Sequence, residues 1–144
     1  MKTCGIITEY NPFHQGHIYH IKKTKELTQC DCLIAIVSNH FTQRGLFSLL
    51  TMQDKTKLAL EAGCNLVIEL PPCYAAQSAD YFAKYAVESL SQLHIDQICF
   101  GSETNNISTL KEYSKQMEST QVVPSLSMNQ NLYTKNIRPN DILG

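Results

Sequence analysis

The sequence has no excess of charge of either sign and no long apolar run. Twelve Lys and Arg against thirteen Asp and Glu give a formal net charge of −1, so the overall balance does not indicate a nucleic-acid-binding or membrane-surface protein. No apolar segment reaches membrane-spanning length, and no apolar signal core follows Lys2. We therefore expect a cytoplasmic protein with no membrane partner. The one dense basic cluster, residues 22–25, is interpreted as a solvated helix face.

The spacing of a common metal site is also missing. Cys30 and Cys32 are separated by a single residue, which is closer than in a zinc knuckle, and no second pair follows. His14, His17 and His20 recur every third residue, without the i, i+4 pair and glutamate of a helical zinc-protease motif. We predict no resident metal site, and six reduced cysteines that lie mostly in or beside buried strands.

Apolar strand-like runs alternate with helical patterns along most of the chain. Strands are expected at residues 3–8, 32–37, 65–70 and 96–100. Helices are expected at about 16–28, 53–62 and 78–93. This alternation predicts an α/β fold, a doubly wound parallel sheet formed by residues 1–118. Residues 119–144 show no clear period, and we expect an irregular tail that ends at the start of a truncated helix near Pro139.

Right-handed crossovers bring the loops that follow parallel strands to one edge of the sheet, where ligands bind in such folds. Four segments should meet there: residues 9–17, 38–45, 71–80 and 101–103. In the second segment Arg44 is the best candidate for a phosphate contact, because its guanidinium offers a fork of donors. A hydrophilic surface loop explains that segment almost as well.

The first of these loops ends in the pattern His14-Gln15-Gly16-His17, at a strand-to-helix turn. The amides that open a helix lack intrahelical partners and lie at the positive end of its dipole, so an anion is stabilised there. Gly16 allows a phosphate to approach the backbone, and His14 and His17 project toward the same ligand from the first turn. The pattern predicts a nucleotide phosphate site; the alternative is a structural turn that carries surface histidines.

Further motifs give the chain a family resemblance. It resembles the N-terminal part of the tRNA(Met) cytidine acetate ligase family, within the wider group of nucleotidyltransferases with a His-x-Gly-His motif. The matching stretches are residues 7–20, Phe41-x-Gln43-Arg44-Gly45, Asp54-x-x-x-Leu58-Ala59-Leu60, and residues 66–71, 77–83, 99–103 and 139–144. The resemblance implies a Rossmann-like nucleotidyltransferase fold with the His-x-Gly-His motif at the first strand-helix turn.

The same resemblance implies an activity and its residues. Family members form acetyl-adenylate from acetate and ATP, and then acetylate N4 of the wobble cytidine of elongator tRNA(Met). His14 and His17 would be catalytic, stabilising charge on the attacked α-phosphorus. The implied ATP-binding residues are Ile7, Thr8, Glu9, Tyr10, Asn11, Pro12, Phe13, His14, Gln15, Gly16, His17, Ile18, Tyr19, His20, Gly101 and Asn140. ATP is expected as a substrate, with Mg²⁺ on its phosphates.

The chain departs from the family pattern in several places. Ser38-Asn39-His40-Phe41 stands where Ser-Gly-Asn-Phe is usual, and Leu46-Phe47 replaces Glu-Pro. Family members also continue well beyond the motif at residues 139–144. These differences predict a truncated or divergent ligase. The alternatives are a small-molecule nucleotidyltransferase and a catalytically inactive nucleotide-binding fragment.

Overall fold

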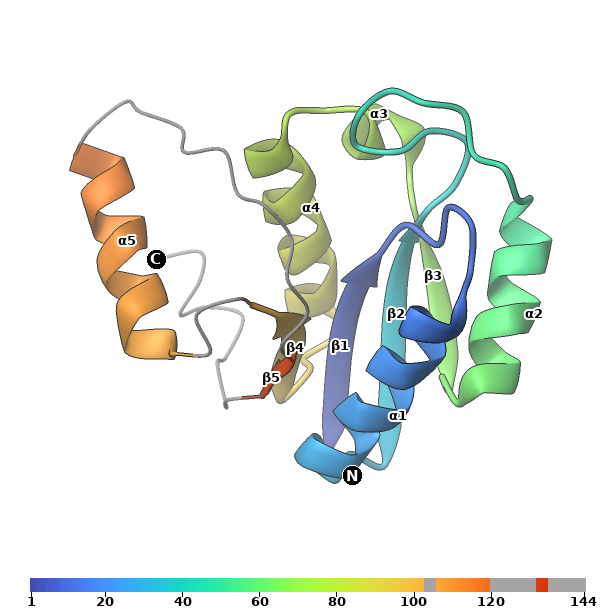
Figure 1. Cartoon of the computed structure of the whole chain (residues 1–144), viewed down its shortest axis with the longest axis horizontal. Coiled ribbons are helices and arrows are strands. Elements are labelled where there is room, and N and C mark those ends of the chain that lie inside the picture. Colours follow the sequence, from blue (N-terminus) through green and yellow to red (C-terminus); the bar gives the residue numbers. More distant parts are fainter. Residues whose placement is uncertain (103–105, 120–131, 135–144) are drawn as a thin grey trace.

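The fold is built on a five-stranded sheet in the order β3-β2-β1-β4-β5 (Figure 1). The computed structural model describes residues 1–102, 106–119 and 132–134. The strands are β1 (Thr3–Thr8), β2 (Cys32–Ser38), β3 (Leu66–Leu70), β4 (Gln97–Gly101) and β5 (Leu132–Thr134). The helices are α1 (Gln15–Thr28), α2 (Met52–Ala62), α3 (Pro72–Ala75), α4 (Ala79–Gln92) and α5 (Ile107–Ser119). Strands β1 to β4 pair in parallel, and β5 pairs antiparallel with β4 at the edge.

Helices cover both faces of the sheet, and β2 shows why. Its side chains alternate between two apolar clusters and almost all are buried, which is typical of a central strand in a parallel sheet. On one face Leu33, Ala35 and Val37 pack with Ile21 of α1 and Ala59 of α2. On the other face, Ile34 and Ile36 share a cluster with residues 86, 87 and 90 of α4. The predicted doubly wound α/β sheet is confirmed.

Helix α4 packs against the backbone of β1 at Gly5. A Cβ atom added to Gly5 would lie 2.7 Å from Cδ2 of Leu90 and 2.8 Å from Cδ1 of Ile95. Contacts this short cannot be kept, so a side chain at this position would require the side chains of Leu90 and Ile95, and with them α4, to shift. The absence of a side chain at Gly5 therefore lets Leu90 and Ile95 pack against the backbone of the central strand.

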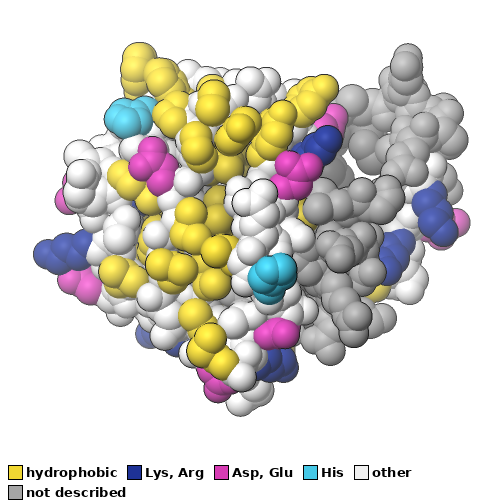
Figure 2. All heavy atoms as spheres, turned by 180° about the vertical axis from the view of Figure 1, so that it is seen from behind, with side chains coloured by type: hydrophobic (Ala, Val, Ile, Leu, Met, Phe, Trp, Pro, Cys, Tyr) yellow, Lys and Arg dark blue, Asp and Glu magenta, His cyan; other side chains and the backbone are white. Residues whose placement is uncertain are grey.

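On the α4 face of the sheet the side chains of the central strands are buried, whereas the edge strand β3 is only partly covered. Figure 2 looks at this face and shows apolar side chains gathered across it. Leu66 of the edge strand β3 is 43% exposed, and Tyr74 and Tyr81, from α3 and the first turn of α4, are 38% and 54% exposed. None of the helices in the described ranges is long and apolar enough to cross a membrane.

Three elements differ from the sequence prediction. The sequence analysis predicts neither helix α3, which is a single turn, nor helix α5. Helix α5 begins where the Asn106 side chain accepts hydrogen bonds from the amides of Ser108 and Thr109 (3.0 and 3.4 Å). Strand β5 lies inside the stretch expected to be irregular, so three residues of the predicted tail belong to the sheet. Three residues are too few to show a period, and pairing with β4 defines this strand. Pro139 and the predicted helix start lie outside the described residues.

Four of the six cysteines are buried, as predicted: Cys4, Cys30, Cys64 and Cys99. Cys73 is exposed on α3. Burial raises the pKa of the Cys64 thiol to about 11 and that of Cys4 further, so these thiols stay protonated at neutral pH. Within the described ranges, no three His, Cys, Asp or Glu side chains are grouped so that they could hold a metal ion.

Candidate functional site

Strands β1 and β4 are parallel neighbours in the sheet. Cys4 pairs with Gln97, and Gly5 with Ile98. Residues 9–14 lead from the carboxyl end of β1 into α1, which begins at Gln15, and Gly101 is the carboxyl end of β4. Because the two strands run in the same direction, both segments follow strand ends at the same edge of the sheet.

The rings of His14 and His17 stack on each other at the start of α1. Their centroids are 3.8 Å apart, with 29° between the ring planes. His14 is the N-cap: its Nδ1 accepts a hydrogen bond from the Gly16 amide (3.1 Å), while Nδ1 of His17 accepts one from the His14 amide (3.2 Å). Because both Nδ1 atoms accept, each neutral ring carries its proton on Nε2, and Nε2–H is the donor that it offers to a ligand.

This arrangement changes the chemistry expected at the helix start. The sequence predicts that backbone amides approach the anion, with Gly16 giving access. In the structure, the imidazoles cap the amides of Gly16 and His14. The donors that the pair presents are therefore two ring N–H groups, supported by the positive end of the α1 dipole.

Aromatic neighbours hold the His17 ring in place. The Tyr10 ring packs edge-on at 4.9 Å and the Phe13 ring lies at 5.5 Å. Burial lowers the pKa of His17 from 6.5 to about 4, and nearby His14 and His20 add to this effect. His17 is therefore a neutral hydrogen-bond donor over the physiological pH range.

The lowered pKa of His17 predicts that acid weakens the fold. Between pH 6.5 and pH 4 the unfolded chain binds a proton at His17 that the folded protein does not bind, so stability falls as the pH falls through this window. We expect a loss of about 1–2 kcal/mol after allowing for partial solvent screening of the half-buried ring. Urea unfolding at a series of pH values should show a smaller loss for His17→Gln. Exposed His94→Gln is the control and should match the wild type; an unchanged pH dependence in His17→Gln would contradict the assignment.

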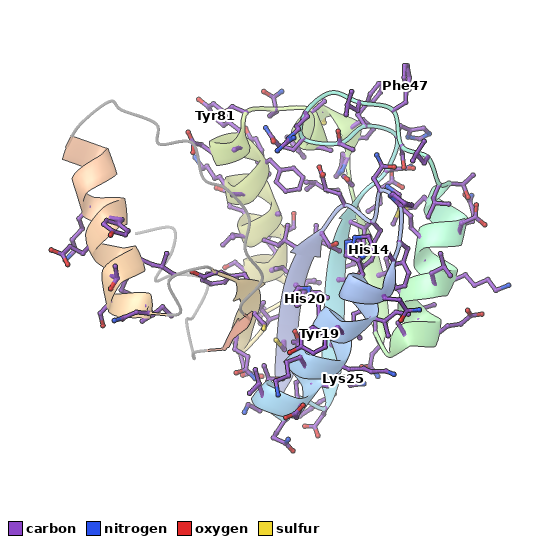
Figure 3. The ribbon with its side chains drawn as sticks, viewed as in Figure 1. His14, Tyr19, His20, Lys25, Phe47 and Tyr81 are labelled. Atoms are coloured by element: carbon purple, nitrogen blue, oxygen red, sulfur yellow. The ribbon has the colours of Figure 1, made fainter. Side chains whose placement is uncertain are left out.

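Side chains of the loop after β1 bind the backbone of the loop between β2 and α2. The Glu9 carboxylate accepts a hydrogen bond from the Gln43 amide. Asn11 Oδ1 accepts from the Leu49 amide at 2.6 Å, and its Nδ2 donates to the Phe47 carbonyl at 3.4 Å. Figure 3 shows Phe47 and Tyr81 toward the same end of the molecule, with His14 at the start of α1. Glu9 thus connects two of the predicted segments, and Asn11 binds the part of the same loop that follows residue 45.

The third predicted segment joins the same group of loops, because Nε2 of Gln43 donates to the Gln77 carbonyl at 3.2 Å. Arg44 lies in the exposed turn before Gly45, whose φ of +74° favours glycine. No contact in the described structure directs Arg44 toward the histidine pair. Its predicted contact with phosphate stays a prediction.

The remaining predicted ATP-binding residues lie in different parts of the chain. Ile7 and Thr8 end β1, and residues 15–20 form the first half of α1. Gly101 is exposed at the end of β4. Tyr10 is only 1% exposed, and a backbone φ of +51° accompanies its inward position, so its ring packs in the core. Asn140 lies outside the described residues.

Two side chains on α1 differ strongly in exposure. Tyr19 is 58% exposed, whereas Nε2 of His20 is buried and makes no hydrogen bond to any described residue. Burial lowers the pKa of His20. Figure 3 places both side chains farther along the helix than His14.

The basic cluster on α1 is only partly a solvated face. Lys22 is exposed, and Lys23 pairs with Glu26 at 2.8 Å. Lys25 instead donates to the Gly63 carbonyl at 2.8 Å, which ties α1 to the end of α2.

The sequence prediction missed Lys55. This side chain is fully buried, and its Nζ donates to the carbonyls of Ser38 (2.8 Å) and Asn39 (3.2 Å), at the carboxyl end of β2. A lysine in the first turn of a helix is usually exposed, so local pattern gives no sign of this role. The only available signal was its place inside the Asp54-x-x-x-Leu58 motif.

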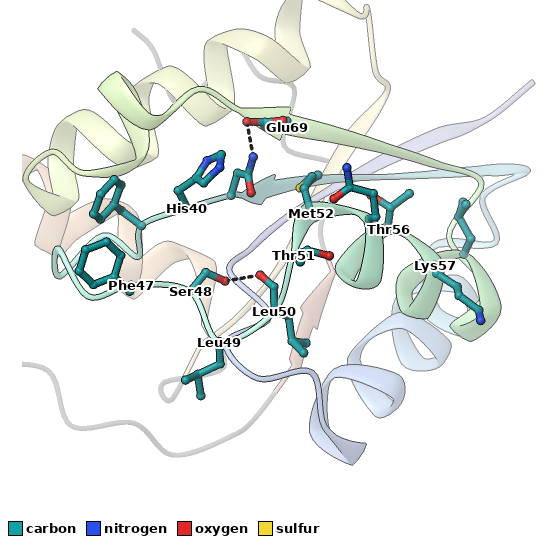
Figure 4. A pocket seen from close by; sticks show the side chains of 14 residues that line it. His40, Phe47, Ser48, Leu49, Leu50, Thr51, Met52, Thr56, Lys57 and Glu69 are labelled. Atoms are coloured by element: carbon teal, nitrogen blue, oxygen red, sulfur yellow. Dashed lines mark hydrogen bonds between the residues drawn. The ribbon is translucent and has the colours of Figure 1, made fainter.

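An open hollow of about 960 Å³ lies next to the site rather than at the histidine pair (Figure 4). Its lining comes from residues 39–41, 47–53, 56, 57, 60 and 69. Its wall includes the segment that Asn11 holds through Phe47 and Leu49, and the Asn39 amide donates to Glu69 Oε1 there at 2.7 Å. Neither His14 nor His17 lines the hollow.

Comparison with known proteins points to one family. The family model described as HIGH Nucleotidyl Transferase matches residues 1–141. A tRNA(Met) cytidine acetate ligase from Geobacillus sp. (strain WCH70) is 50% identical over 115 residues, which cover 80% of this chain and 29% of that protein. A homologous enzyme from Clostridium novyi (strain NT) is 49% identical over 116 residues, with the same coverage.

Comparison with solved structures points to the same family. A crystal structure of Thermotoga maritima TmcAL bound with alpha-thio ATP superimposes with a TM-score of 0.78 at 37% identity, covering 84% of this chain and 30% of that one. The chain therefore spans less than a third of the length of these relatives.

Proposed function

This chain belongs to the HIGH nucleotidyl transferase family, and we propose that it binds ATP at the histidine pair to activate acetate as acetyl-adenylate. The further proposed step is transfer of the acetyl group to N4 of the wobble cytidine of elongator tRNA(Met), in the cytoplasm. The stacked His14–His17 pair, with two Nε2–H donors at the start of α1, is the observation that carries the proposal. The names of the relatives support it, as does the nucleotide bound to the Thermotoga protein.

The chemistry needs no nucleophile from the protein. An acetate oxygen attacks the α-phosphorus of ATP, the bond from that phosphorus to the bridging oxygen breaks, and pyrophosphate leaves. Negative charge grows on the α-phosphate oxygens during this step, and the Nε2–H groups of His14 and His17 are positioned to stabilise it. The cytidine amine then attacks the acetyl carbonyl, AMP leaves, and the amine loses a proton. Mg²⁺ would enter on the ATP phosphates.

The remaining residues of the proposed ATP site have different tasks. Gly101, at the carboxyl end of β4, has no side chain, so the adenosine would lie close to the backbone there. Glu9 and Asn11 shape the site indirectly, because both bind the loop after β2. Asn140 stays in the proposal on the family motif alone.

Acetate-dependent exchange of labelled pyrophosphate into ATP tests the first step directly. We expect exchange only when acetate is present, and product analysis would reveal transfer of AMP to a different acceptor, as expected for a small-molecule nucleotidyltransferase. ATP at 100 times its Kd should also stabilise the chain by about 2.7 kcal/mol. If this chain shows neither binding nor exchange while the Thermotoga protein shows both in the same buffer, the proposal is wrong.

A second candidate is a chain that binds ATP without turnover. It is favoured by the departures from the family pattern in the loop after β2, at residues 38–41 and 46–47. Binding and thermal protection by ATP without any acetate-dependent exchange would support this reading.

A further inference from the structure

The open hollow beside the loop after β2 combines aromatic side chains with a carboxylate. Phe41 and Phe47 both line it, and their ring centroids lie 5.1 Å apart with 38° between the ring planes. Phe47 is 77% exposed, so one aromatic ring is open to a ligand. Glu69, near the end of β3, and Asn39, directly after β2, line the hollow as well. Apolar walls with a few polar groups are typical of sites that bind flat organic rings.

A hydrogen bond orients the Glu69 carboxylate in this hollow. Asn39 Nδ2 donates to Glu69 Oε1 at 2.7 Å, and Asn39 is only 8% exposed, so its amide is held by its surroundings (Figure 4). Among the residues that the structure describes, none donates a hydrogen bond to the second oxygen of Glu69, Oε2. This oxygen can therefore accept a hydrogen bond from a ligand. Because a carboxylate only accepts, the ligand must present an N–H or O–H group to it.

A cation lies at another part of the same hollow. Figure 4 shows Phe47 and Lys57 on opposite sides of Glu69, and Lys57 is exposed and pairs with no carboxylate in the described ranges. A purely apolar ligand would leave the Glu69 carboxylate buried without a partner, which is costly. A simple anion would be repelled by that carboxylate. A nucleotide with an exocyclic amine satisfies all three features: it has a flat ring, an N–H edge and a phosphate.

We propose that the hollow binds a cytosine base of a single-stranded RNA loop, with the ring against Phe41 and Phe47 and the exocyclic amine donating to Glu69. The inference rests on the proposed function, which requires an unpaired cytidine. Unpaired bases are commonly recognised by stacking on aromatic side chains and by hydrogen bonds to their Watson–Crick edges. The hollow adjoins the proposed ATP site, because Asn11 from the loop after β1 binds the backbone of Phe47 and Leu49 in its wall. The role of Glu69 is to select the base.

The test compares two single-stranded RNAs of about seven nucleotides. One contains only uridine, and the other has a single central cytidine. Their affinities are measured by fluorescence anisotropy at one fixed salt concentration, since the phosphate contribution depends on salt. The wild type should bind the cytidine RNA about tenfold more tightly. Uracil carries a carbonyl oxygen where cytosine carries the amine, and that oxygen would face the Glu69 carboxylate. Equal affinities would overturn the inference.

Glu69→Gln is the deciding variant. Asn39 Nδ2 would keep the new amide oxygen on its side, so the amide NH₂ would face the hollow and donate to the uracil carbonyl. The preference should therefore reverse, with the uridine RNA bound several-fold more tightly than the cytidine RNA, roughly the worth of one base-edge contact. A structural role of Glu69 would instead weaken both complexes equally. That result, or an unchanged preference for cytidine, would overturn the inference.

Two matched controls separate the hollow from the rest of the surface. Glu61→Gln makes the same change at an exposed position of α2 outside the hollow, and it should keep the preference of the wild type. Phe47→Ala should weaken both complexes about tenfold, because stacking does not distinguish the two bases. Tyr81→Ala removes an exposed aromatic ring outside the hollow and should leave both affinities unchanged. Full affinity in Phe47→Ala, or a reversal of preference in Glu61→Gln, would overturn the inference.

Circular dichroism checks that each variant is folded. If Glu69→Gln does not fold, the wild type decides through its preference for cytidine over uridine. A third RNA with a central adenosine tests the choice of base, because adenine also carries an exocyclic amine; affinity equal to that of the cytidine RNA would overturn the assignment to cytosine. Acetate-dependent exchange needs no RNA. Absent exchange with an intact preference for cytidine therefore contradicts the proposed function alone, and normal exchange without that preference contradicts only this inference.

Discussion

Replacing His17 by alanine is expected to lower acetate-dependent ATP–pyrophosphate exchange by about 100- to 1,000-fold, the usual cost of removing one preorganised donor to a developing negative charge. The ring is held by Tyr10, Phe13 and His14, so its Nε2–H group is fixed before the substrate binds. Its pKa of about 4 keeps it neutral at the assay pH. The loss should appear mainly in the exchange rate and much less in ATP affinity, because the donor matters most when charge develops.

Two companion variants separate chemistry from helix capping. His14→Ala removes the N-cap as well as a donor, so it should lower both exchange and stability, the latter by about 1 kcal/mol. His94→Ala changes an exposed histidine away from the site and should retain wild-type exchange. Exchange at the wild-type rate in folded His17→Ala would remove His17 from the mechanism. If the wild type binds ATP without turnover, the same variant should still weaken ATP binding.

The elements that the sequence predicts correctly are those with a local repeating pattern. Strand β1 is expected at 3–8 and found at Thr3–Thr8, and α4 is expected at 78–93 and found at Ala79–Gln92. Both patterns extend over enough residues for burial on one or two faces to leave a clear period. Helix α3 and strand β5 span four and three residues. Their conformation depends on Pro71 and on pairing with β4, which no local period reveals.

The candidate site also contains contacts that the sequence predicts and contacts that only the folded structure reveals. His14 and His17 come together as the N-cap and third residue of α1, each accepting a backbone amide, and their spacing is that of a capping box. The contact between Lys55 and Ser38 joins two elements, and it becomes visible only once α2 is packed on the sheet. Tyr10 shows another limit of local pattern: its ring is buried in the core, which the family motif does not reveal. The motif thus predicts where the site lies, whereas tertiary packing decides which side chains face it.

Replacing Gly5 by valine is expected to destabilise the fold strongly. The new side chain would occupy space already filled by Leu90 and Ile95, whose atoms lie 2.7–2.8 Å from the position of its Cβ. Overpacking in a core costs about 1–3 kcal/mol and sometimes more. We expect about 3 kcal/mol for valine and about 1–2 kcal/mol for alanine, as measured by urea unfolding. Because α4 would move away from β1, the end of β1 that leads into the histidine pair should also be disturbed, and ATP binding should weaken.

A double-mutant cycle identifies the contact responsible. Leu90→Ala alone should cost about 2–5 kcal/mol, because it leaves a cavity under α4. In the Gly5→Ala/Leu90→Ala variant the new methyl group enters that cavity, so the total cost should fall at least about 1 kcal/mol below the sum of the single costs. Gly45→Ala is the matched control: Gly45 has a φ of +74° and no neighbouring atom within 4 Å of a new Cβ, so its cost comes from backbone strain alone and should simply add to that of Leu90→Ala. Additive costs for Gly5 and Leu90 would show that α4 does not rest on the backbone of β1, and the distance between helix and strand would then need another cause.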